Sequence, residues 1–143
     1  MKKTVTLSIR GQQSYADQEP DVLELVTEGT LEAVDSGWRL SYEESDLTGL
    51  EGVNTTFQIQ DKTVTLIRSG KLNSQMVFQE GIPHDSLYQM EFGALMLTVC
   101  AIKVDANLSE SGGTIDLKYR IEVEQNDAGM IEYHLDIQMK KDA

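Results

Sequence analysis

The sequence predicts an all-β protein, an antiparallel up-and-down β-barrel of about 8–10 strands. The strongest signal is a pair of segments near the C-terminal end. Residues 113–124 alternate apolar and polar side chains without a slip, and residues 131–140 do so again after a predicted turn at residues 126–129 (Asn-Asp-Ala-Gly). Because successive side chains of a strand point to opposite faces, each segment is a half-buried strand and the two form a hairpin. Most other connections are short, and closing the sheet removes its exposed edges, so a barrel is favoured.

The N-terminal part of the chain shows the same alternation. Residues 3–10 place Val5, Leu7 and Ile9 on one face of a strand. Residues 11–21 are polar and contain one proline, so we expect a loop there. After a turn at residues 35–37, the alternation of residues 38–43 predicts a further strand.

Residues 22–34 allow two interpretations. Val22, Leu25 and Val26 have the spacing of one helix face. The segment also contains Gly29 and two threonines, and its alternate residues share one strand face. We favour a long strand that bends at Gly29, because glycine has no side chain to resist the bend.

Short alternating stretches continue through the middle of the chain. Each stretch has apolar residues on one face and ends at glycine, proline or a tight polar connection. The expected strands are residues 55–60, 63–68, 75–79 and 86–92, and the expected connections are residues 44–53, 69–71 and 81–83.

Residues 94–104 form the longest apolar run and are apolar on both faces. A strand buried on both sides has this composition. The second cover would be residues 22–34, a loop or a partner subunit. Residues 105–112 are polar and are expected to form a loop before the closing hairpin.

The length and charge of the chain limit its partners. Its 143 residues suit one domain, so we treat residues 1–143 as a single barrel. The 24 acidic and 12 basic residues give a net charge of −12. Such a surface repels phosphate backbones and anionic lipids, so we expect no nucleic-acid binding and no membrane binding.

The cysteine content and the N-terminal segment point to the cytoplasm. Cys100 is the single cysteine, which excludes an internal disulfide and favours a reducing compartment. It lies in the longest apolar run, where we expect a buried and inert thiol. The N-terminal residues lack the about 7–15 unbroken apolar residues of a secretory signal. No window approaches the roughly 18 apolar residues of a membrane helix.

Several short motifs follow one another along nearly the whole chain. They are Trp38-x-Leu40-x-Tyr42-x-Glu44, Arg68-x-Gly70, Met76-x-Phe78 followed by Gly81, Phe92-Gly93, and Gly113-x-Ile115-x-Leu117-x-Tyr119. Together they resemble the YwiB-like family of small bacterial proteins, whose fold is a calycin-like (lipocalin-like) β-barrel. The resemblance implies that fold, and it implies no activity or catalytic residue, because the family has none assigned.

A barrel of this size either fills with its own side chains or encloses a small ligand. The expected inner faces carry several aromatic rings and one arginine, which would suit a partly apolar ligand. The same rings could instead pack together as the core, and the sequence leaves both alternatives open. The candidate ligand-binding residues are Trp38, Tyr42, Arg68, Phe78, Tyr88, Phe92 and Tyr119.

Arg68 is the most informative of these residues. It is in phase with Val64 and Leu66, so its side chain should point toward the same side of the sheet. A guanidinium at the mouth of a barrel can hold a carboxylate or phosphate head group. Alternatively, the strand frays at Ser69 and Gly70, and Arg68 reaches solvent.

The sequence shows no catalytic or metal-binding pattern. His84 and His134 are far apart, one in an expected loop and one on a polar strand face, and no spacing suits zinc. No nucleophile motif and no phosphate-binding glycine loop is present. We therefore expect a non-enzymatic protein, without cofactor or metal, that binds a small apolar or amphipathic ligand. The alternative is a protein-interaction module or homodimer with a filled barrel and an exposed apolar surface.

Overall fold

The fold was analysed in a computed structural model. It describes residues 2–14, 19, 21–35, 37–44, 51–60, 62–90, 93–124 and 126–139, with only the backbone described at 90 and 126–128. Within these ranges, ten strands form one closed barrel in the order β1-β10-β9-β8-β7-β6-β5-β4-β3-β2. Every neighbouring pair is antiparallel. The predicted all-β, up-and-down barrel is therefore confirmed.

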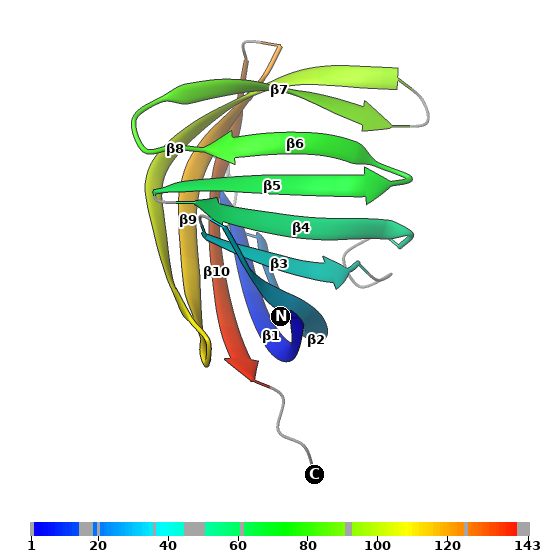
Figure 1. The fold of residues 1–143 in the computed structure, drawn as a ribbon. Helices are drawn as coiled ribbons and strands as arrows, with labels where there is room; N and C mark the ends of the chain where they lie inside the picture. Colours follow the sequence, from blue (N-terminus) through cyan, green and yellow to red (C-terminus); the bar gives the residue numbers. More distant parts are fainter. Residues whose placement is uncertain are drawn as a thin grey trace.

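Figure 1 shows that β4, β5 and β6 run across the long strands β8, β9 and β10 at a steep angle. Among the described residues, no helix is long and apolar enough to cross a membrane. The strands are β1 (Lys2–Ser14), β2 (Asp21–Val34), β3 (Gly37–Glu43), β4 (Val53–Gln60), β5 (Thr63–Gly70), β6 (Asn73–Phe78), β7 (Pro83–Met90), β8 (Gly93–Ser109), β9 (Gly112–Val123) and β10 (Asn126–Met139).

Several strands extend into segments that the sequence analysis assigned to loops. Gly11–Ser14 pairs with residues 130–133 of β10, and residues 105–109 of β8 pair with the start of β9. The prediction of a turn over residues 126–129 is also wrong, because Asn126 already pairs with Val123 and a bulge lies between Asp127 and Gly129. Backbone hydrogen bonds do not depend on apolar alternation, so polar residues can continue a ladder.

The interpretation of residues 22–34 as a strand is correct, and the helical alternative is wrong. The segment pairs with β1 on one side and with β3 on the other. Gly29 is buried, and a Cβ atom there would lie 2.7 Å from the Ser41 carbonyl oxygen and 2.8 Å from Leu7 Cδ1. Glycine at this position therefore permits the close approach of β2 to its neighbours.

The apolar run in β8 is buried on one side rather than on both. Leu97, Val99 and Ala101 are buried inside the barrel. Met96 and Ile102 are 45% and 49% exposed, and a bulge between Ala101 and Lys103 turns the strand at that point. Cys100 is also partly exposed, so the prediction of a buried thiol is wrong. Among the described residues, the outer face of this run carries no second layer.

The shortest ladder of the barrel joins β6 to β7. The described residues pair at two positions, Asn73 with Gln89 and Ser74 with Tyr88, and an isolated bridge joins Gln79 to Ile82. Between them, the buried hydroxyl of Ser86 donates a hydrogen bond to the carbonyl oxygen of Gln75. A side chain therefore supplies part of the bonding that the backbone provides elsewhere.

The interior divides into two halves along the barrel axis. The packed half is at one end of the barrel, which carries the β2–β3, β4–β5, β6–β7 and β8–β9 connections. The hollow half is at the opposite end, which carries the β1–β2, β3–β4, β5–β6, β7–β8 and β9–β10 connections. The alternation of β1, β5 and β9 sends branched aliphatic side chains into the packed half. Its largest fully buried apolar side chains are Phe57, Phe78, Leu7, Leu31, Leu40, Leu66, Ile115 and Leu135.

Candidate functional site

A cavity of about 710 Å³ occupies the hollow half of the barrel. This volume lies within the roughly 300–1,000 Å³ of small-molecule sites. Its wall is largely apolar, and its polar residues come from β1 and β2 (Gln12, Gln13 and Asp21) as well as from β5, β7, β9 and β10. The lining side chains include Val22, Leu23, Arg68, Met76, Tyr88, Leu95, Leu97, Tyr119, Ile121, Val123, Ile131 and Tyr133.

The predicted lining residues separate into two groups. Arg68, Tyr88 and Tyr119 line the cavity. Phe78 is fully buried in the core with its ring centroid 4.6 Å from that of Tyr119, and Trp38 is half-buried against the same core. Tyr42 is also buried and belongs to the core cluster, while Phe92 lies outside the described residues. Trp38, Tyr42 and Phe78 therefore pack in or against the core, as the alternative to ligand binding predicts.

Arg68 lies on the inner face of the hollow half. Strand β5 continues to Gly70, so the alternative of a frayed strand end is wrong. The guanidinium Nε is shielded from solvent and has no hydrogen-bond partner in the described part of the chain. None of the ion pairs found among the described residues includes Arg68.

Ser74 is the register partner of Arg68 on β6 and shares this property. Its side chain is buried, with 7% exposed, and its Oγ also has no hydrogen-bond partner among the described residues. An unsatisfied buried polar group costs roughly 1–3 kcal/mol, and more when the group is charged. Arg68 lines the cavity, so its buried guanidinium marks a place where a ligand acceptor would fit, whereas Ser74 is not among the lining residues.

A buried carboxylate lies near the same wall. Glu44 follows β3 and is 8% exposed, and its Oε2 accepts a hydrogen bond of 2.5 Å from the hydroxyl of Thr55. The side chain of Tyr42 is hydrogen-bonded to it as well. Thr55 pairs with Tyr42 on one side and with Arg68 on the other, so a row of polar side chains crosses β3, β4 and β5.

Burial keeps the tyrosines near this row uncharged. Loss of solvent raises the pKa of Tyr42 well above its usual range, with Glu44 and Tyr133 adding to the rise. Burial raises the pKa of Tyr119 in the same way, again with Tyr133 contributing. Burial alone would lower the pKa of Arg68. The neighbouring Tyr133, Tyr42 and Glu44 more than offset this effect and raise the pKa above its ordinary value, so the guanidinium stays charged.

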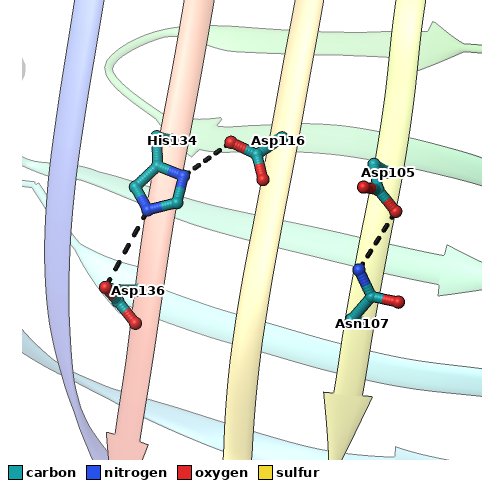
Figure 2. Close-up of polar contacts among 5 residues, drawn as sticks. All are labelled: Asp105, Asn107, Asp116, His134 and Asp136. Carbon is teal, nitrogen blue, oxygen red and sulfur yellow. Dashed lines mark hydrogen bonds and ion pairs between the residues drawn. The ribbon is translucent and has the colours of Figure 1, made fainter.

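A second polar group lies on the outer wall of β8, β9 and β10. Figure 2 shows His134 between Asp116, 2.5 Å from its Nδ1, and Asp136, 3.8 Å from its Nε2. Asn107 donates to Asp105 at 3.1 Å on the neighbouring strand. Among the described residues, no three His, Cys, Asp or Glu side chains converge in a way that would hold a metal ion.

His84 is placed differently from its prediction. It lies in β7 rather than in a loop, is half-buried, and its Nε2 is 3.1 Å from Oε1 of Gln79. Its position comes from β7 starting at Pro83, earlier than the sequence predicts.

The sequence analysis missed Ser74 and Glu44 as site residues, and Tyr133 was not selected. A signal was available for each of them. Ser74 is in phase with Met76 and Phe78, which places it on the inner face of β6. Glu44 continues the inward phase of Leu40 and Tyr42 one step beyond the strand. Polar residues at inward positions are thus the pattern that identifies this site.

The comparisons with known proteins agree with this fold. The crystal structure of the ywiB protein from Bacillus subtilis superimposes with a TM-score of 0.87 at 23% sequence identity, covering 98% of this chain and 94% of that chain. No curated protein matches the sequence. The family described as "Domain of unknown function (DUF1934)" matches residues 7–137. The predicted relation to YwiB-like proteins is confirmed, and the chain belongs to the DUF1934 family.

Proposed function

We propose that this protein binds a small, partly apolar molecule in the cavity of the hollow half, with the polar end of the ligand at Arg68. The observation that carries the proposal is the buried Arg68 guanidinium, which lines a cavity of about 710 Å³ and whose Nε has no hydrogen-bond partner among the described residues. A buried donor on a charged group is costly unless a partner satisfies it. An acidic head group in the cavity would pair with the charge of this guanidinium.

The apolar part of the wall supports the other half of the proposal. Met76 and Leu97 lie deep in the cavity. Val22, Leu23 and Leu95 also line it, yet they are 49%, 37% and 37% exposed. An apolar ligand would cover part of this surface and contribute roughly 25 cal/mol for each Å² removed from water.

Binding rather than catalysis fits the polar groups that the cavity offers. General acids and bases work best with pKa values near the ambient pH. Burial raises the pKa of Tyr119 far above neutrality, and the Arg68 guanidinium holds its proton more tightly than usual. These groups are suited to donating hydrogen bonds to a ligand.

Native mass spectrometry of freshly purified protein, compared with the denatured mass, tests the proposal. We expect a reproducible extra mass that is lost on denaturation. Ile131→Trp places an indole in the cavity and should remove the extra mass, because Ile131 lines the cavity. Glu132→Trp is the matched control, since Glu132 is the next residue and is exposed. Retention of the mass in Ile131→Trp would place the ligand elsewhere.

Self-association is a second candidate function, favoured by the outer face of β7 and β8. Leu87 and Met96 are register partners, and each is 45% exposed. Ile82 and Ile102 nearby are 46% and 49% exposed. If this face joins two copies, sedimentation velocity should show a dimer, and Leu87→Lys should convert it to a monomer. A monomer in the unmodified protein would reject this candidate.

A further inference from the structure

We infer that the head group bound at Arg68 is a single carboxylate, so that the ligand class is a monocarboxylic acid with a slender apolar tail. This inference rests on the proposed function and names its ligand. It depends on the geometry and charge of the groups around Arg68.

The first step concerns geometry. Arg68 on β5 and Ser74 on β6 are register partners, and both side chains point to the inner face. Nε of Arg68 and Oγ of Ser74 are both shielded and both lack a partner among the described residues. Of the two residues, Arg68 is the one that lines the cavity, and its planar guanidinium carries a fork of N–H groups that can donate to both oxygens of one carboxylate. Ser74 also pairs with Tyr88, whose ring borders the cavity.

The second step concerns charge. Glu44 is the carboxylate that acts on Arg68, while burial raises the pKa of Tyr42 and Tyr119 and keeps them protonated. Asp21 adds a second carboxylate to the cavity wall, next to Val22. The carboxylate of Glu44 is held by the hydroxyls of Thr55 and Tyr42. A dianionic phosphate would bring two further charges toward this buried carboxylate. A monocarboxylate brings one and still forms charge-assisted hydrogen bonds, which are roughly twice as strong as neutral ones.

The third step concerns the tail. Beyond the polar row, the cavity is bounded by Met76, Leu97 and Ile121, and toward its mouth by Val22 and Leu95. These side chains are uncharged, and Asp21 beside Val22 would repel an anionic group at the mouth, so the acidic end of the ligand belongs at Arg68. An alkyl or similar chain that runs from Arg68 toward the mouth would cover the exposed apolar residues there.

Calorimetric titration with decanoate, decanol and decyl phosphate tests the inference, because the three probes share one tail and differ in the head group. We expect decanoate to bind the unmodified protein about tenfold or more tightly than decanol. Arg68→Gln should abolish that preference. Arg120→Gln is the control, since Arg120 is exposed, and this variant should retain the preference.

Each other outcome has a defined meaning. Equal binding of decanoate and decanol, or tighter binding of decyl phosphate, would overturn the carboxylate inference and leave the proposed apolar site intact. Failure of all three probes to bind would overturn the proposed function itself. Circular dichroism verifies that the variants fold. If Arg68→Gln does not fold, Arg68→Lys replaces it, and the loss of planar two-point contact should still lower the preference for decanoate.

Discussion

The packed and hollow halves of this barrel are built from the same ten strands, yet they differ in what the strands send inward. The packed half receives leucine, isoleucine, valine and phenylalanine, all nearly fully buried. The hollow half receives Arg68 and tyrosines among its apolar lining residues. At Gly11 it receives no side chain, so the Tyr133 ring lies 3.6 Å from where a Cβ would be. Alternation thus determines the fold, while the identity of the inward residues determines whether the interior is a core or a site.

The largest expected difference between the halves is in stability. Phe78 in the packed half is fully buried and contacts the Tyr119 ring, so Phe78→Ala should lower the free energy of unfolding by about 3–5 kcal/mol. Tyr88 in the hollow half is half-buried beside the cavity, and Tyr88→Ala should cost well under half as much. Urea unfolding measures both values. Equal losses would show that the hollow half contributes to the core as the packed half does.

The next effect concerns the two buried charges of the hollow half. Arg68→Met leaves the Glu44 carboxylate buried beside Thr55 without an opposing guanidinium, so it should destabilise the protein. Adding Glu44→Gln should recover part of the loss, with a coupling free energy of about 0.5–3 kcal/mol in a double-mutant cycle.

A matched cycle separates this coupling from a general effect of charge. Arg120 is exposed on the outer wall, and Arg120→Met combined with Glu44→Gln should be additive to within about 0.5 kcal/mol. Additivity in the Arg68 cycle as well would mean that Arg68 and Glu44 do not influence one another, contrary to the site described above.

The sequence was sufficient for the architecture and for part of the site. Period-two alternation predicted the barrel and the inward phase of Arg68, because side-chain direction follows directly from the pleat. It could not separate Phe78, which packs in the core, from Tyr88, which lines the cavity, because depth along the barrel axis depends on register between strands. Register is a property of pairs of strands, and alternation within one strand carries no information about it.

Strand ends were the weakest part of the prediction for a related reason. The polar residues 105–109 continue β8 because the start of β9 pairs with them, and nothing in their own composition indicates a strand. Ser74 was missed because a single serine is unremarkable in sequence. Its meaning depends on the facing Arg68 and on the absence of a partner for its hydroxyl within the described residues.

A smaller loss of stability should appear at alkaline pH. It comes from the buried tyrosines, such as Tyr119, which contacts Phe78 of the packed half and lines the cavity of the hollow half. Burial raises the pKa of Tyr119 above the ordinary value of 10.0 that applies in the unfolded chain. Below pH 10.0 both states hold the proton and the contribution of Tyr119 to stability is fully present. Above it the unfolded state releases the proton first, so the free energy of unfolding falls as pH rises.

Urea unfolding at about pH 9 and about pH 11 would measure this loss. Tyr119→Phe should lose less stability across that interval than the unmodified protein, because phenylalanine has no proton to release. Tyr42→Phe should behave in the same direction, since burial raises the pKa of Tyr42 too. An equal fall in all three proteins would assign the alkaline sensitivity to other groups.

The smallest effect is expected on the outer wall, which differs from both halves of the interior in being solvated. Oδ1 of Asp116 lies 2.5 Å from Nδ1 of His134, but the two side chains are 32% and 45% exposed, so water and salt screen the pair. Asp116→Asn should change the free energy of unfolding by less than about 1 kcal/mol. It should leave ligand affinity unchanged, because Asp116 lies on the face opposite to the cavity-lining residues of β9. A loss as large as that of Phe78→Ala would show that the His134–Asp116 contact in Figure 2 stabilises the barrel as strongly as a core side chain does. Solvent exposure would then be a poor guide to how much a side chain contributes to stability.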